Sequence, residues 1–219
     1  MILAAGRGTR MGTLTASTPK PLLELAGDTL IGRQLGRLAA AGVTDVVINL
    51  SRHGEQIRAA IGDGSGHGLN VRYSAEPDQP LETAGGIVAA LPLLGPEPFL
   101  VANADVVSDF DFARLDATRG LGTLVLVQNP PHHPDGDYGL AADARVTRDS
   151  PRRTFAGLSV LSPELFAGLA PGRRSLVEVF EPAIAAGQLF GVVHDGFWID
   201  AGTPERLAAA RAALTSGSP

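Results

Sequence analysis

The chain contains no cysteine among its 219 residues, so it can form neither a disulfide framework nor a thiolate metal site. No apolar run approaches the roughly 20 residues that a membrane-spanning helix requires. The chain enters an apolar segment at once, without the charged region or the cleavage site of a signal peptide. We therefore expect a cytoplasmic protein that has no membrane partner.

Positive charge is also scarce, since the formal net charge is −5 at pH 7. Nucleic-acid-binding proteins usually display a basic surface, so we expect no nucleic-acid partner. Of the 18 lysine and arginine residues, only Lys20 is a lysine. It lies between Pro19 and Pro21, and two explanations stay open from composition alone. It is either a chance survivor in an arginine-rich chain or a site that needs a compact ammonium group.

The composition is that of an ordinary globular protein, with 44% hydrophobic and 19% charged residues. This length suffices for one well-filled core and is short for two. The sequence shows no internal repeat and no linker long enough to separate domains. We expect one domain over residues 1–214, followed by a short tail, residues 215–219, that is disordered.

Apolar runs and helical periodicities alternate along the first part of the chain. Buried strands are predicted at 1–5, 46–48 and 71–74, with helices over 30–41 and 53–61 between them. This order predicts an α/β fold with a doubly wound, mainly parallel sheet. The later predicted elements are strands at 99–102, 123–128 and 155–161 and helices at 81–91, 162–170, 176–186 and 204–213.

A glycine-containing turn, Gly6-Arg7-Gly8-Thr9-Arg10, follows the first predicted strand. Turns of this kind present backbone N–H groups to phosphate, so a nucleotide is the expected ligand. The glycines at 6, 8 and 12 do not have the G-x-G-x-x-G spacing, and no P-loop motif is present. A redox dinucleotide-binding protein is therefore disfavoured.

Residues 3–11, together with Thr18-Pro19-Lys20-Pro21, resemble the signature of the sugar-phosphate nucleotidylyltransferases almost letter for letter. Later segments, 81–86, 103–105, 138–139 and 197–203, are similar to further elements of that family. The resemblance implies a Rossmann-like, GT-A-like catalytic domain. Its implied activity is transfer of a nucleoside monophosphate from an NTP to a sugar 1-phosphate, with Mg²⁺ as cofactor. Whether the protein is a monomer or a small homo-oligomer stays open.

The resemblance also assigns roles to individual residues. Arg10 and Lys20 are the implied catalytic residues: Arg10 faces the leaving pyrophosphate, and Lys20 stabilises charge between the two substrates. The implied nucleotide-binding residues are Ala5, Gly6, Arg7, Gly8, Thr9, Arg10, Thr83 and Gly86. The implied sugar-binding residues are Asn103, Gly139 and Gly157.

Two aspartates are predicted metal ligands. Asp105 follows the strand at 99–102, and Asp200 ends the apolar run 197–199, where a buried carboxylate is costly unless it is paired or metal-bound. Ligands of open α/β sheets bind at the carboxyl ends of strands, so we expect Asp105 and Asp200 to share one Mg²⁺. Without metal, the two carboxylates should repel each other. His132 and His133 are adjacent in a proline-rich loop where neighbouring side chains point apart, so we expect no metal there.

The sugar side is less well defined by the sequence. Family members often carry an E-K-P element where this chain has Asp149-Ser150-Pro151-Arg152, so no carboxylate is assigned to the sugar hydroxyls. Glu178 is a candidate by position alone, and a solvated helix glutamate is the simpler interpretation.

Within the family, the compact single-domain form is most similar to members that uridylylate N-acetylmuramic acid 1-phosphate in peptidoglycan recycling. Mannose- or heptose-1-phosphate guanylyltransferases share nearly every motif and remain the alternative. A non-catalytic regulator that binds an NDP-sugar is a third hypothesis, against which stands the presence of Lys20, Asp105 and Asp200.

The isolated lysine generates a prediction. The change Lys20→Arg should abolish most activity although it keeps the charge, because a planar guanidinium cannot replace a compact ammonium beside a crowded phosphorus. Pyrophosphate release, measured for the variant and the wild type at saturating substrates, tests this. Near wild-type turnover would mean that the lysine reflects compositional chance.

Overall fold

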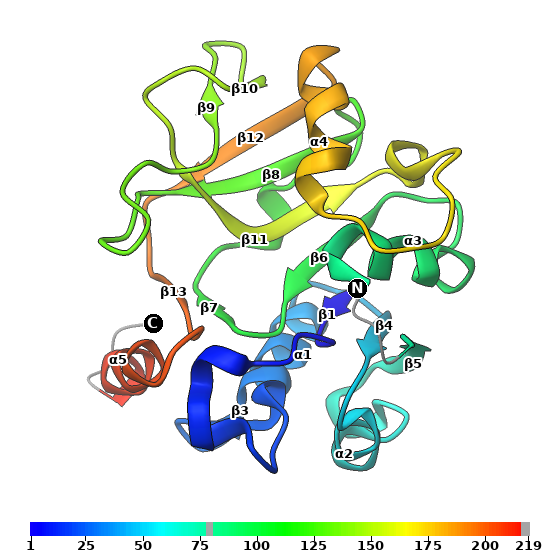
Figure 1. The fold of residues 1–219 in the computed structure, drawn as a ribbon, viewed down its shortest axis with the longest axis vertical. Coiled ribbons are helices and arrows are strands. Elements are labelled where there is room, and N and C mark those ends of the chain that lie inside the picture. The colour runs from blue at the N-terminus through cyan, green and yellow to red at the C-terminus, as the bar shows by residue number, and fades with distance from the viewer. Residues whose placement is uncertain (78–80, 216–219) are drawn as a thin grey trace.

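A central sheet of seven strands forms the middle of the molecule (Figure 1), and the computed structural model describes residues 1–77 and 81–215. The strands lie in the order β12 (Leu189–His194), β8 (Gly122–Val127), β11 (Thr154–Leu161), β6 (Phe99–Asn103), β1 (Ile2–Leu3), β4 (Asp45–Leu50) and β5 (Asn70–Ala75). Only β11 runs antiparallel to its neighbours, β6 and β8. The predicted single α/β domain with a mainly parallel sheet is confirmed.

Helices cover both faces of the sheet because its strands are apolar on both sides. Ile2 and Ile48 pack on one face with α1 (Leu30–Ala40) and α2 (Gly54–Ile61). Met1 and Val47 pack on the other face with α3 (Glu82–Leu94) and α4 (Leu176–Ala185). The alternation of adjacent residues between two cores explains why the first strand carries no polar side chain.

The chain reverses its direction of winding between β1 and β6. From β1 it passes outward to β4 and β5, and then returns to pair β6 with the other edge of β1. Such a switch point leaves a crevice at the carboxyl ends of the two strands, since the following loops move apart. The loop that begins at Gly6 and the turn that carries Asp105 both leave from this crevice.

The C-terminal segment crosses to the same place. Strand β13 (Trp198–Asp200) pairs antiparallel with β7 (Val106–Ser108), and α5 (Pro204–Thr215) follows. The predicted apolar strand before Asp200 therefore exists, but it belongs to a two-stranded ribbon outside the main sheet. Thr203 Oγ1 accepts a hydrogen bond from the Arg206 N–H at 3.3 Å, so Thr203 caps the start of α5.

Three predicted boundaries were wrong. The helix expected over 162–170 is only a short 3-10 helix, Pro163–Phe166, and Gly168 adopts a left-handed φ of 74° that a helix cannot continue through. Helix α3 continues through Pro92, which near a helix end removes only one hydrogen bond. Helix α5 includes Thr215, which was assigned to the tail, and residues 216–219 lie outside the described residues.

Across residues 1–77 and 81–215, no helix combines the length and the apolar character needed to cross a bilayer.

Candidate active site

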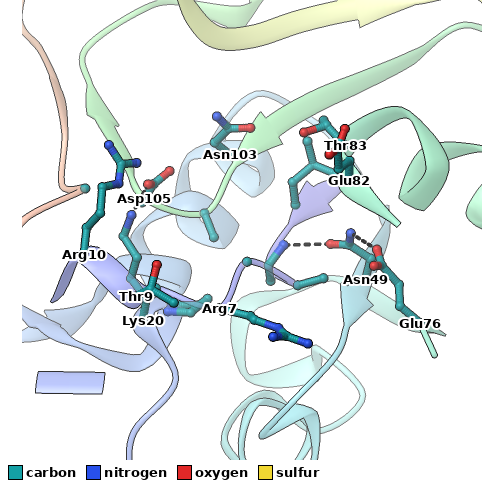
Figure 2. A pocket seen from close by; sticks show the side chains of 18 residues that line it. Arg7, Thr9, Arg10, Lys20, Asn49, Glu76, Glu82, Thr83, Asn103 and Asp105 are labelled. Atoms are coloured by element: carbon teal, nitrogen blue, oxygen red, sulfur yellow. Dashed lines mark hydrogen bonds and ion pairs between the residues drawn. The ribbon is translucent and has the colours of Figure 1, made fainter. Parts of the chain in front are cut away.

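A cavity of about 430 Å³ lies at the carboxyl ends of β1 and β6 (Figure 2). The loop after β1, the turn after β6 and the start of α3 surround it. The predicted site residues that line it are Ala5, Gly6, Arg7, Gly8, Thr9, Arg10, Lys20, Thr83, Asn103 and Asp105. Arg10, Lys20 and Asp105 lie together at one side, and Thr83 lies at the other (Figure 2).

The glycine-containing loop is shaped by its contact with Lys20. Gly8 has a left-handed φ of 62°, and a Cβ placed there would come within 3.2 Å of Lys20 Cβ. A 3-10 helix, Thr9–Thr15, follows, and its Met11 side chain is buried at 1% exposure against α5. The loop is thus fixed at both ends, and it presents Arg10 to the cavity.

Each predicted metal ligand has a cationic partner. Lys20 Nζ forms an ion pair with Asp105 Oδ2, and both side chains are largely buried. Asp200 Oδ1 lies 2.9 Å from Arg206 Nη1 and 3.7 Å from His132 Nε2. Each carboxylate charge is thus balanced within the protein, although the expected repulsion between the two remains, since burial and, in addition, the charge of Asp105 raise the pKa of Asp200.

The two aspartates are nevertheless neighbours. The Ala201 N–H donates to the Asp105 carbonyl at 2.8 Å, which holds their segments side by side. Burial raises the pKa of Asp200 above its usual value; the charge of Arg206 opposes this rise, and that of Asp105 adds to it. Asp105 and Asp200 therefore belong to one electrostatic unit.

The donor set suits a hard divalent cation. Asp200 Oδ1 is buried and accepts no hydrogen bond from the described residues, although Arg206 is close to it. In the described part of the chain, no group of three or more His, Cys, Asp or Glu side chains could hold a metal. The protein would then supply two carboxylates, which fits Mg²⁺ because this ion completes its coordination with water and substrate phosphates.

Asp200 and three predicted glycines do not line the cavity. A Cβ at Gly86 would approach Glu76 Oε1 to 2.4 Å, so this glycine makes room for the Glu76 side chain. A Cβ at Gly157 would lie 2.4 Å from Asn103 Nδ2, and one at Gly139 would lie 2.2 Å from the Asp149 carbonyl. Gly86 and Gly157 are thus required by close packing against side chains that line the cavity, whereas Gly139 packs against the backbone of Asp149, which does not line it.

Sequence reasoning missed Asn49 and Glu76, which line the cavity on the same side as Thr83 (Figure 2). Asn49 Oδ1 accepts from the Ala4 N–H at 2.7 Å, and Asn49 Nδ2 donates to Glu76 Oε1 at 2.7 Å. Burial raises the pKa of Glu76, and hydrogen bonds from Asn49 and from the Leu81 backbone partly offset the rise. Asn49 is a polar residue directly after the apolar run 46–48, and this position was the sequence signal that could have identified it as a site residue.

Gln34 was also missed, because it lies on the buried face of α1 at 1% exposure. Its Nε2 donates to the Asn103 carbonyl at 3.0 Å, and its Oε1 accepts from Arg37 Nη1 at 3.0 Å. Arg37 Nη2 in turn donates to the Phe110 carbonyl at 2.7 Å. This chain of hydrogen bonds fixes the end of β6, from which Asp105 projects.

Other candidates have structural partners. His132 lies beside Asp200, whereas His133 Nε2 lies 3.1 Å from Asp137 Oδ1, so the two histidines do not act as a pair. Glu178 forms a capping box with Ser175, and the hydrogen bonds from Ser175 lower the pKa of Glu178. This explains Glu178 without a sugar ligand.

Comparison with known proteins gives one family. The protein-family model described as Nucleotidyl transferase matches residues 1–148 of this chain. N-acetylmuramate alpha-1-phosphate uridylyltransferase of Neisseria meningitidis serogroup B is 47% identical, over 97% of this chain and 96% of the relative. The enzyme of that name from Caulobacter vibrioides is 35% identical, over 98% and 96% of the two chains. Mannose-1-phosphate guanylyltransferase of Mycobacterium tuberculosis is 34% identical, over 99% of this chain and 64% of the relative.

Solved structures support the fold. HddC from Yersinia pseudotuberculosis superposes with a TM-score of 0.79 over 97% of each chain, at 22% identity. A Bacillus anthracis protein solved in complex with sucrose gives a TM-score of 0.83 over 96% of this chain and 92% of that one, at 19% identity.

The contacts of Asn49 generate a prediction. Asn49→Ala should lower the free energy of unfolding by about 1–3 kcal/mol, because it leaves the buried Ala4 N–H without its partner and removes one of the hydrogen bonds to the Glu76 carboxylate. It should also raise the KM for the nucleotide, since Ala4 lines the cavity just before the glycine-containing loop that begins at Gly6. Urea denaturation and steady-state kinetics check both effects. Asn70→Ala, at an exposed position of β5, is the matched control; an equal loss there would contradict the assignment.

Proposed function

The chain belongs to the nucleotidyl transferase family, and we propose that it transfers the uridylyl group of UTP to N-acetylmuramic acid 1-phosphate. The products are the UDP-sugar and pyrophosphate. The observation that supports this reaction type is the meeting of the phosphate loop, Lys20 and Asp105 in one cavity. The similarity to two uridylyltransferases over nearly the whole chain supports the choice of substrates.

The chemistry needs no deprotonating base. A phosphate oxygen of the sugar 1-phosphate, already an oxyanion, attacks the α-phosphorus, and the bond to pyrophosphate breaks. What the protein must supply is alignment of the two substrates and stabilisation of the charge that develops. A cavity lined by loop amides, two arginines and one lysine is suited to this task.

The proposed roles follow from position. The loop Gly6–Arg10 wraps the triphosphate, with Arg10 toward the leaving pyrophosphate. Lys20 leaves Asp105 to stabilise charge at the α-phosphate, which its compact ammonium group allows. Thr83 borders the nucleotide base. Gly86 contributes indirectly, because it leaves space for Glu76 at the same side of the cavity.

The sugar is assigned to the Asn103 side of the cavity, where Gly157 gives room to the Asn103 side chain. Gly139 is assigned to the sugar from the family resemblance. Asp105 and Asp200 would hold Mg²⁺, which when bound offsets phosphate charge and polarises the phosphoryl oxygens. We place the reaction in the cytoplasm, where nucleoside triphosphates are available, and in peptidoglycan recycling, where N-acetylmuramic acid is recovered.

Guanylyl transfer to mannose 1-phosphate is the second candidate, supported by the relative from Mycobacterium tuberculosis. It is the lesser reading because identity to that enzyme is 34%, against 47% to the uridylyltransferase from Neisseria meningitidis. A non-catalytic binder of NDP-sugars is not favoured, since Lys20 and both aspartates are in place.

A pyrophosphate-release screen tests the proposal. All four NTPs are paired with a panel of sugar 1-phosphates that includes N-acetylmuramic acid, mannose, heptose and glucose 1-phosphates. We expect the highest kcat/KM for UTP with N-acetylmuramic acid 1-phosphate. A clear preference for GTP with mannose or heptose 1-phosphate would establish the second candidate instead, and release with no pair would support the regulator.

A mutant cycle tests the shared metal. Asp105→Asn and Asp200→Asn should each abolish most Mg²⁺-dependent turnover, and the double variant should lose little more than the worse single, because the pair acts as one unit. Pyrophosphate release across a Mg²⁺ titration gives the three values. Fully multiplicative losses, or normal metal dependence of Asp200→Asn, would leave Asp105 as the sole carboxylate on the metal.

A further inference from the structure

Two internal ion pairs balance the charge of the predicted metal site. Asp105 is paired with Lys20, and Asp200 is paired with Arg206. The four groups together carry no net charge. Lys20 already has a role in the proposed mechanism, whereas Arg206 does not line the cavity and belongs to none of the predicted site residues.

The position of Arg206 in α5 holds its guanidinium at Asp200 but leaves two of its nitrogens without hydrogen-bond partners among the described residues. It is the third residue of the helix, and its side chain is 16% exposed. Its Nη1 lies 2.9 Å from Asp200 Oδ1, yet Nε and Nη2 are buried and have no hydrogen-bond partner among the described residues. A guanidinium with two unmet donors is a counter-ion that a better arrangement can displace.

The charge of the expected ligand fits such a displacement. A nucleoside triphosphate carries about four negative charges at neutral pH, and one Mg²⁺ leaves about two of them. Lys20 and Arg206 together carry two positive charges. When the two aspartates bind the divalent cation of this complex, Lys20 and Arg206 are released from them and can face the phosphates. The two positive charges of Arg7 and Arg10, which line the same cavity, then balance the remaining charge.

We propose that Arg206 is the resident counter-ion of Asp200 in the free enzyme and competes with the divalent cation for this carboxylate. The identity of the nucleotide in this inference rests on the proposed function, whereas the competition between Arg206 and the cation does not depend on it. Its consequence is that a divalent cation binds weakly alone and tightly together with nucleotide. The enzyme therefore avoids filling its metal site before the triphosphate is present.

The experiment measures Mn²⁺ binding without sugar or turnover, by the loss of the EPR signal of free Mn²⁺. In Arg206→Met the affinity for Mn²⁺ without nucleotide should rise about tenfold over the wild type, because a unit charge next to the metal site is gone. Arg206→Lys keeps the charge and should stay within about twofold of the wild type. With UTP present, the difference between Arg206→Met and the wild type should shrink.

Arg211→Gln is the matched control, since Arg211 lies on the same helix and donates to the Glu24 carbonyl at 3.0 Å. It removes an equal charge away from the site and should leave Mn²⁺ affinity within about twofold of the wild type. Thermal melts with and without Mn²⁺ verify folding, and the stabilisation by Mn²⁺ should be larger for Arg206→Met. If this variant does not fold, Arg206→Gln replaces it.

Unchanged or weaker Mn²⁺ binding in the charge-neutral variant would overturn the proposal, and so would an equal gain in Arg211→Gln. Absence of Mn²⁺ binding in every variant, with or without UTP, would overturn it as well. Failure of the proposed function has a different signature: the wild type releases no pyrophosphate with any substrate pair, whereas the Mn²⁺ affinities still differ as expected.

Discussion

The active-site cavity depends on the pairing of β1 between β4 and β6. This short strand is buried on both faces, and its register sets Leu3 beside Asn49 on one neighbour and beside Asn103 on the other. Because all three strands are parallel, the residues that follow them emerge at one edge of the sheet. The phosphate loop, the Asn49–Glu76 hydrogen bond and the turn that carries Asp105 are consequences of this one arrangement.

Electrostatics in the site is local. The protein carries a formal net charge of −5, so no general positive field is available to attract a triphosphate. Instead, cationic side chains lie next to the two carboxylates that are the predicted metal ligands. Partial burial strengthens these ion pairs and makes an unpaired charge costly, which explains why neither Asp105 nor Asp200 stands alone.

A small apolar cluster connects the two ends of the chain at this site. Met11 and Leu25 pack there with Val107, Ala201 and Leu207. The contact joins the outer end of the phosphate loop to the β7–β13 ribbon and to α5. It therefore fixes the distance between Arg10 and the segment that carries Asp200 and Arg206, although β13 belongs to a two-stranded sheet separate from the main one.

The sequence by itself determined the local elements and the chemistry available to them. The alternation of apolar strands with helical segments predicted the parallel sheet, and the glycine turn with Lys20 predicted a phosphate site. Each of these signals lies within a few consecutive residues. Only the tertiary structure decided that β11 runs antiparallel, that Asp200 lies on a separate ribbon, and that Asn49, Glu76 and Gln34 support the site. The tertiary structure also decided which cation pairs with each aspartate, since Lys20 and Asp105 are 85 positions apart in the sequence. Periodicity describes only which face of its own element a residue occupies, whereas a charge partner is chosen by the packing of elements that the chain brings together from a distance.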